Sequence, residues 1–400
     1  MKVAVVGAGS MGGMHADLLG AMDDVDGLYV VDADADRADE VARRNGGSAV
    51  SFEDAIEDAD AIVIATPPEL HRSAVEAALD AGIHVLCEKP LTEALGSTIE
   101  LTERIEVEGA HVEIGFQRRH DAGYLAARRA AGSGRIHLVR LTAHDPLVGL
   151  TPPPSGQPPE VAPIFRDSSI HDFDMARWLS GQEVIEVFVE AGRRDGTRPD
   201  DPRLIESAVF SMRLSGGTLA VLDQSWLHPG GYDNRIELFS ETAAVTGGLS
   251  PRTPSQHADW VAEPADPWQG YLERYEPAYR AELEAFLACC RGIRPPAATA
   301  RDGLEAMRVA VAATRSHVQT SASRFSCAAF PSRSLSTIAL RHPGTTVQTS
   351  VGSSKAARTC SLVRQEVATR KPSRRLSPQC DPSPTASRSM SACGSGVPVA

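Results

Sequence analysis

Short apolar runs alternate with amphipathic segments along the first 116 residues. The runs are too short for helices and indicate buried strands, whereas the segments between them carry apolar and charged residues at helical spacing. The predicted strands are Val3–Val6, Leu28–Val31, Ala61–Ala65, His84–Cys87 and His111–Ile114. The predicted helices are Met14–Met22, Arg37–Arg44, Ser73–Ala81 and Ala94–Glu106. Such alternation predicts a parallel sheet with right-handed crossovers.

From about residue 135 the pattern changes to longer strands joined by short turns. The predicted strands are Ile136–Thr142, Val184–Ala191, Ile205–Leu214, Gly217–Gln224 and Arg235–Phe239. Tight turns such as Ser215–Gly217 favour an antiparallel or mixed sheet. Helices are predicted near Ser169–Leu179, Glu276–Cys290 and Arg301–Arg315, and the proline-rich stretch Thr151–Pro163 is predicted to be a loop. The fold class is therefore α/β, with one domain over residues 1–118 and a second α/β domain over residues 119–316.

The segment 317–400 differs from the rest in composition. It holds 11 Lys and Arg against 2 Asp and Glu, is rich in Ser and Pro, and carries four of the seven cysteines. A sequence of this kind buries too little apolar surface to offset the entropy of ordering. We predict a disordered, basic, low-complexity tail, whose origin is either an altered reading frame or an ordinary linker or interaction tail.

Length and charge restrict the class of protein. A chain of 400 residues can hold two domains with cores, and its net charge of −12 gives no electrostatic support for nucleic-acid binding. No apolar run approaches the roughly 18 residues of a membrane-spanning helix. The cysteines lack the spacing of a metal site. The sequence predicts a reduced cytoplasmic protein with no metal and no nucleic-acid or membrane partner.

A glycine-rich turn joins the first predicted strand to the first helix. Gly7, Gly9 and Gly12 form G-x-G-x-x-G, with Ser10 and Met11 before the last glycine. In a dinucleotide-binding turn the first glycine permits a tight turn, the second admits the pyrophosphate, and the third allows close packing of helix on strand. Free N–H groups at the helix start then face the phosphates. We expect these five residues to bind a dinucleotide, which would make the sheet doubly wound.

Asp32 ends the second predicted strand, 20 residues beyond Gly12. A carboxylate there accepts hydrogen bonds from ribose hydroxyls and repels a 2′-phosphate, which favours NAD over NADP. Asp34 is a neighbouring candidate, and Arg37 offers a positive charge that could attract a phosphate. A solvated acidic helix start is the alternative.

Thr66 and Pro67 follow the third predicted strand, at the edge where ligands bind in folds of this kind. His71, just beyond, is interpreted as structural rather than catalytic.

Glu88, Lys89 and Pro90 follow the fourth predicted strand at the same edge. The Lys89 ammonium could stabilise alkoxide charge on a substrate hydroxyl. Pro90 would shape the backbone, and a cis Lys–Pro bond is one way to do so. A surface turn is the alternative for this triplet.

The stretch from Asp167 to Asp174 is the second dense polar cluster. Asp167 and His171 are four residues apart, so they share a face if a helix starts here, and Asp167 could equally cap that helix. Histidine is suited to accept a proton near neutral pH, and a neighbouring carboxylate would orient it. We interpret His171 as catalytic because the chain also has a nucleotide-binding turn; a structural histidine is the alternative.

Together these motifs resemble the glucose–fructose oxidoreductase and inositol dehydrogenase (Gfo/Idh/MocA) family over roughly residues 1–316. The resemblance is nearest to inositol 2-dehydrogenases. It rests on Gly7–Gly12 with His15, Ala65–Pro68 with His71, Val85–Leu91, Phe165–Asp174 and Arg177–Leu179. It implies an N-terminal Rossmann domain and a C-terminal α/β domain whose open, mostly antiparallel sheet mediates homo-oligomers, either dimers or tetramers.

The resemblance also implies roles for individual residues. His171 would remove the hydroxyl proton, Asp167 would orient His171, and Lys89 would bind the reacting oxygen. NAD would contact Gly7, Gly9, Ser10, Met11, Gly12, Asp32, Thr66, Pro67, His71, Glu88 and Lys89. The substrate would contact Lys89, His144, Asp145, Asp167, His171, Tyr232 and Tyr279. Ordinary packing is the alternative for His144, Asp145 and the two tyrosines.

The predicted function is an NAD-dependent dehydrogenase that oxidises a secondary hydroxyl of a polyol or sugar, with an inositol as the leading substrate. The alternatives are a family member that acts on a different sugar or reduces an imine or enone, a non-catalytic nucleotide-sensing regulator, and a damaged gene product that lacks its last strand. The intact set of Lys89, Asp167 and His171 argues against the sensor, which has no need of it.

Overall fold

The computed structural model describes residues 1–132, 134–146, 161–196, 201–253, 266–319 and 325–326. Most of the predicted proline-rich loop and of the predicted tail lies outside these residues.

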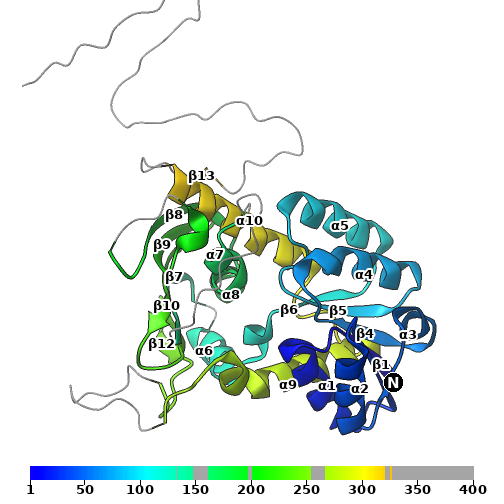
Figure 1. The fold of residues 1–400 in the computed structure, drawn as a ribbon. Helices are drawn as coiled ribbons and strands as arrows, with labels where there is room; N and C mark the ends of the chain where they lie inside the picture. Colours follow the sequence, from blue (N-terminus) through cyan, green and yellow to red (C-terminus); the bar gives the residue numbers. More distant parts are fainter. Residues whose placement is uncertain (133, 147–160, 197–200, 254–265, 320–324, 327–400) are drawn as a thin grey trace, which may run out of the picture. The chain divides into compact units, whose positions relative to one another are not determined.

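Six parallel strands form the first sheet in the order β3-β2-β1-β4-β5-β6 (Figure 1). They are β1 (Lys2–Val6), β2 (Gly27–Val31), β3 (Ser48–Ala49), β4 (Ala61–Ile64), β5 (His84–Glu88) and β6 (Val112–Gly115). The helices between them are α1 (Ser10–Gly20), α2 (Ala35–Arg44), α3 (Phe52–Asp58), α4 (Pro68–Asp80) and α5 (Leu95–Glu108). The strand order reverses between β1 and β4, which confirms the predicted doubly wound sheet and marks its switch point.

The central strands of this sheet are buried on both faces. Val3, Ala4 and Val5 of β1 are 0% exposed, because helices cover both sides. This is why the strands are continuous apolar runs in the sequence and could be located from it. β3 and α3 were missed because β3 has only two residues and α3 is short and mostly acidic.

The second sheet has the order β12-β11-β7-β10-β9-β8-β13. Its strands are β7 (Ile136–Pro146), β8 (Val184–Gly192), β9 (Ser207–Leu214), β10 (Leu219–His228), β11 (Asp233–Ser240), β12 (Ala244–Gly247) and β13 (Phe325–Ser326). Within the described residues only β7 and β10 pair in parallel, so the predicted open, mostly antiparallel sheet is confirmed. Along β9 and β10 buried and exposed residues alternate, so one face packs on helices and the other is open.

The remaining helical elements follow the first sheet or flank the second. They are η1 (Gln117–His120), α6 (Ala122–Ala131), α7 (Pro163–Asp167), α8 (Ser169–Ser180), η2 (Pro202–Leu204), α9 (Tyr271–Cys290) and α10 (Ala300–Val318). The predicted boundary between residues 118 and 119 falls inside η1. α10 ends at Val318, and β13 pairs with the edge of β8, so ordered elements reach into the segment predicted as a disordered tail. An unpaired strand edge offers backbone groups that such a short strand can bond.

α9 and α10 connect the two sheets. α9 lies beside α1, and its Tyr279 and Phe286 share one hydrophobic cluster with Val3 of β1. α10 packs on α8 and β8 and also on α5 (Figure 1). No helix in the described part of the chain is long and apolar enough to cross a membrane.

Candidate functional site

Lys89 projects from the carboxyl end of β5 toward Asp167 at the end of α7. Its Nζ donates to the Asp167 carboxylate at 2.7 Å and to the Asp167 carbonyl oxygen at 2.8 Å. The ammonium of Lys89 lowers the pKa of Asp167, which is therefore ionised at neutral pH. An ammonium has three N–H donors, so one remains for a ligand. The Lys89–Pro90 peptide bond is cis, the form considered from the sequence.

His171 lies on α8, buried, with its ring edge-on to Phe116 at a centroid distance of 5.9 Å. Burial holds the pKa of His171 well below 6.5, and the positive charges of Lys89 and Arg118 lower it further. The imidazole is therefore neutral at neutral pH and able to accept a proton.

Within the described residues Asp167 makes its hydrogen bonds to Lys89 and none to His171, the partner that the sequence suggested. Its carboxylate is bound by Lys89, and among the described residues Nδ1 of His171 has no hydrogen-bond partner. Asp167 does not cap α8 either, because Ser168 occupies the N-cap position. Ser168 separates α7 from α8, so the two residues stand on different helices.

Asp145 of β7 lies within the electrostatic surroundings of Lys89 and Asp167. Burial raises its pKa to about 7, against the opposing charge of Arg118, and the carboxylate of Asp167 raises it further. A carboxyl group with a pKa so strongly raised, within the influence of a lysine and an arginine, is typical of a catalytic or binding site.

The other three residues predicted to contact substrate are engaged with the protein. His144 follows the opposite alternation from Asp145 on β7, and its Nε2 pairs with Asp223 at 3.0 Å. Tyr232 and Tyr279 are buried in a hydrophobic cluster. The hydroxyl of Tyr279 accepts a hydrogen bond from Gln117 at 2.9 Å. Contact of these three residues with a substrate stays a prediction of the sequence.

Two residues near the site were missed in the sequence. Arg118 of η1 is buried, and its Nη1 donates to Asp172 at 2.7 Å. Tyr271 begins α9; burial raises its pKa, and the ammonium of Lys89 acts in the opposite direction. Arg118 could have been found, since it follows β6 at the same edge of the sheet where Lys89 follows β5. Nothing local marks Tyr271, because α9 comes from the far end of the chain.

The glycine-rich turn has the shape that a dinucleotide requires. Gly7 has φ +95°, and a Cβ there would lie 2.7 Å from the carbonyl oxygen of Ala65. A Cβ at Gly12 would lie 1.6 Å from the carbonyl oxygen of Gly7. A Cβ at Gly9 would meet no atom within 4 Å, so the space that a pyrophosphate would enter is open.

A cavity of about 890 Å³ borders this turn. Gly9 and Ser10 line it, and α2 and α9 supply further walls. Met11, the next residue of α1, is partly buried against the hydrophobic cluster that α9 completes. The second domain therefore contributes a wall that the sequence of the turn does not reveal.

Asp32 binds the turn from the end of β2. It accepts hydrogen bonds from the N–H groups of Ala8 at 2.6 Å and Asp34 at 2.8 Å and from the guanidinium of Arg37 at 2.6 Å. Burial opposes its ionisation, but these bonds outweigh burial and lower the pKa of Asp32. Asp34 caps α2 through the N–H of Arg37. The positive charge of Arg37 is therefore compensated by Asp32.

The loop after β4 is tied to the loop after β5 by His71. Its ring nitrogens lie 2.8 Å from the carbonyl oxygen of Thr66 and 2.9 Å from that of Pro90. Pro67 stands at the N-cap of α4. The buried hydroxyl of Thr66 has no partner among the described residues, so it is available to a bound cofactor.

Glu88 precedes Lys89 at the end of β5 and binds its backbone N–H through the side-chain carboxylate. Its carboxylate lies 2.8 Å from Nε2 of His15 and accepts a longer bond, 3.3 Å, from the backbone N–H of Lys89. Glu88 is buried, and this engagement favours a role in holding the Lys89 backbone.

Known proteins match both halves of the described fold. Residues 1–116 match an oxidoreductase family with an NAD-binding Rossmann fold, and residues 126–246 match the GFO/IDH/MocA C-terminal domain. The chain is 36% identical to the myo-inositol dehydrogenase Hyg17 of Streptomyces leeuwenhoekii, over 79% of this chain and 97% of the relative. It is 32% identical to the myo-inositol 2-dehydrogenase of Thermotoga maritima, over 79% and 96%. Its fold matches a scyllo-inositol dehydrogenase from Lactobacillus casei with bound NAD(H) and scyllo-inositol, with a TM-score of 0.73, 24% identity and coverage of 82% and 99%.

Proposed function

Because the chain belongs to the Gfo/Idh/MocA family of oxidoreductases, we propose that it oxidises a secondary hydroxyl of a cyclitol or sugar with NAD, and that an inositol is its substrate. The supporting observation is that Lys89, at the carboxyl edge of the NAD-binding sheet, binds Asp167 of the second domain and that its charge acts on His171 of α8 and Asp145 of β7. Inositol dehydrogenases among the relatives, matched over nearly their whole length, support the substrate class.

Lys89 and His171 act on different atoms of the substrate hydroxyl, Lys89 on its oxygen and His171 on its proton. The free N–H of the Lys89 ammonium donates to the reacting oxygen and stabilises the negative charge that develops on it. The neutral imidazole of His171 accepts the hydroxyl proton as the C–H bond breaks. Asp167 holds Lys89 in place through the bonds at 2.7 and 2.8 Å. When bound, the nicotinamide supplies the acceptor for the hydride.

The residues around the glycine-rich turn fit NAD. The open space at Gly9 suits the pyrophosphate, and the buried hydroxyl of Thr66, which has no hydrogen-bond partner among the described residues, can bond to the cofactor. We propose that the ionised carboxylate of Asp32 binds the adenosine ribose and disfavours the 2′-phosphate of NADP.

We propose that the protein forms a homo-oligomer, a dimer or a tetramer, through the open face of the second sheet. Phe188, Val209, Leu219 and Val221 are 38, 53, 44 and 37% exposed there. An apolar face of this kind favours association. Light scattering on the native protein and on a Val209→Lys variant tests this; a monomeric native protein would contradict it. Location in the cytoplasm stays a prediction of the sequence.

A panel of inositols and sugars, incubated with NAD while NADH absorbance is followed, tests the reaction. We expect turnover with at least one inositol. Turnover with other sugars but with no inositol would indicate a family member that acts on a different sugar. Oxidation of NADH by an imine or enone, with no alcohol oxidised, would indicate the reductive alternative.

His171→Ala and Lys89→Ala separate catalysis from nucleotide binding. Both variants are expected to lose turnover by orders of magnitude and to keep the native affinity for NADH, measured by fluorescence. NADH binding without turnover on any panel member would favour a nucleotide sensor. Failure of the purified native chain to bind NADH or to unfold cooperatively would favour the damaged gene product.

A further inference from the structure

Among the described residues no hydrogen bond holds the ring of His171 at Nδ1, so its placement depends on the helix that carries it. Two ion pairs fasten that helix, α8, to η1. Arg118 donates to Asp172 at 2.7 Å, and Arg119 donates twice to Asp174, at 2.8 and 2.5 Å. All four side chains are at most 6% exposed. Consecutive arginines at the end of the NAD-binding sheet thus hold the two carboxylates that follow His171 along α8.

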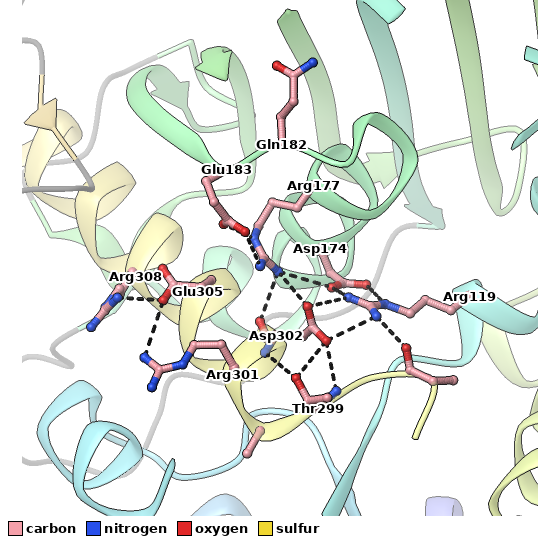
Figure 2. Close-up of polar contacts among 12 residues, drawn as sticks. Arg119, Asp174, Arg177, Gln182, Glu183, Thr299, Arg301, Asp302, Glu305 and Arg308 are labelled. Carbon is pink, nitrogen blue, oxygen red and sulfur yellow. Dashed lines mark hydrogen bonds and ion pairs between the residues drawn. The ribbon is translucent and has the colours of Figure 1, made fainter. Parts of the chain in front are cut away.

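The pair of Arg119 and Asp174 is part of a larger network (Figure 2). Asp302 lies 3.1 Å from Arg119 and 3.4 Å from Arg177. Arg177 also lies 3.7 Å from Asp174 and binds Glu183 at 2.6 Å. Two guanidinium groups therefore meet three carboxylates, of which Asp174 is fully buried and Glu183 is more than half exposed.

The network joins three elements at one point. Asp174 and Arg177 come from α8, Arg119 from η1, and Asp302 from the first turn of α10, where it completes a capping box with Thr299. α10 itself packs on α5 of the NAD-binding domain and on β8 of the second sheet. A shift of α8 relative to Lys89 would therefore have to break buried charge pairs or move α10.

We propose that Asp174 is a positioning residue for His171, and that the network of Arg119, Asp174, Arg177 and Asp302 fixes the distance between His171 on α8 and Lys89 on β5. Asp174 follows His171 by three residues and so lies one helical turn away. It touches Arg119 rather than any reacting group and acts through the helix. Because reacting groups must be held to within a fraction of an ångström, a displacement of about 1 Å costs on the order of 10²-fold in rate. The proposal rests on the proposed dehydrogenase function for its kinetic consequence.

Asp174→Asn keeps the size of the side chain and removes its charge. We expect kcat to fall on the order of 10²-fold, with KM and NADH affinity changed little, because no residue of α8 lines the cavity at the glycine-rich turn. Glu305→Gln is the matched control: Glu305 also pairs with an arginine, Arg308 at 2.6 Å, but lies within α10 and outside the network. It is expected to leave kcat unchanged.

A double-mutant cycle with His171→Ala distinguishes positioning from general damage. If Asp174 acts through His171, Asp174→Asn lowers the residual rate of the His171→Ala variant little or not at all. An equal loss in both backgrounds would overturn the proposal. Asp174→Asn removes the nearer of the two carboxylates that Arg119 pairs with and leaves the buried guanidinium only Asp302, which risks unfolding. Asp302→Asn is therefore the second variant. It keeps the pair of Arg119 and Asp174 and is expected to show the same non-additivity with a smaller loss.

A titration of His171 by NMR does not depend on turnover. Its resonance is identified by its absence from the His171→Ala spectrum. In Asp174→Asn we expect the pKa of His171 to rise toward 6.5, because a loosened α8 admits water to the ring. An unchanged pKa and kcat in a folded Asp174→Asn protein would refute the positioning role. A native protein with no turnover on any substrate, but with this pKa shift, would refute the proposed function alone.

Discussion

Replacement of Lys89 by Met is the sharpest test of how the site works, because stability and catalysis should respond by different amounts. The side chains of Lys89 and Asp167 are 16% and 68% exposed. An ion pair with one partner so exposed contributes about 0–1 kcal/mol to folding. Loss of one preorganised donor to a developing oxyanion costs roughly 10²–10³-fold in kcat, or about 2.7–4 kcal/mol. The catalytic loss should therefore exceed the loss of stability several-fold.

The same variant should also change the pH profile. His171 must be neutral to accept a proton, so kcat/KM falls as the pH drops through its pKa. Burial sets that pKa well below 6.5, and the charge of Lys89 lowers it further. Without the ammonium the pKa of His171 rises, and the acid limb of the profile moves to higher pH.

Initial rates of NADH formation across pH, together with urea unfolding curves, measure both quantities. An acid limb that stays in place, or moves to lower pH, would show that Lys89 does not act on the base. A loss of stability as large as the loss of rate would show that Lys89 is mainly structural. The variant Lys89→Arg, which keeps the charge, serves as the control and should leave the acid limb near its native position.

Three further predictions concern the neighbours of this site. Asp32→Ser should weaken NADH binding by about 10-fold or more, since hydrogen bonds to a charged group contribute roughly 1.5–3 kcal/mol. It should also strengthen NADPH binding, because Arg37 loses the carboxylate of Asp32. Fluorescence titrations with both nucleotides check this, and an unchanged NADPH affinity would contradict the role of Arg37. Arg118→Met should lower the free energy of unfolding by about 3–5 kcal/mol, because the carboxylate of Asp172 is left buried and uncompensated; a loss below about 1 kcal/mol in urea would argue against that pair. The pKa of Asp145 is about 7, and its ionised carboxylate accepts hydrogen bonds from substrate hydroxyls better than the protonated form does. KM should therefore fall as the pH rises through that value. Asp145→Asn should abolish this pH dependence of KM, and a dependence that survives in the variant belongs to another group.

Much of the first domain could be predicted from local pattern. Strands such as Val3–Val6 and Ala61–Ala65 are apolar along their whole length because both faces of a parallel sheet are covered. The turn at Gly7 is visible because a side chain there would collide with Ala65. β3 and α3 were not predicted, because two residues are too few to show the pattern of a strand and α3 is short and mostly acidic.

The site was predictable where a motif follows a strand, and less so where distant segments meet. Lys89 was placed correctly at the sheet edge, but the spacing of Asp167 and His171 suggested a contact that the break between α7 and α8 removes. Arg118 follows a strand at the same edge and could have been found, whereas Tyr271 became visible only once α9 was in place. The partner of Asp174 is 55 residues away in the chain, beyond the reach of any local pattern.

The sequence by itself determined that strands and helices alternate, that a glycine-rich turn admits a dinucleotide, and that a lysine and a histidine stand beside strand and helix ends. These are consequences of short-range sterics and of periodic burial. The tertiary structure alone decided which charges neutralise one another. Asp167 pairs with Lys89, and Arg118 and Arg119 pair with carboxylates of the helix that carries His171. Pairing of buried charges depends on which segments the core brings together, and desolvation makes that choice costly to change.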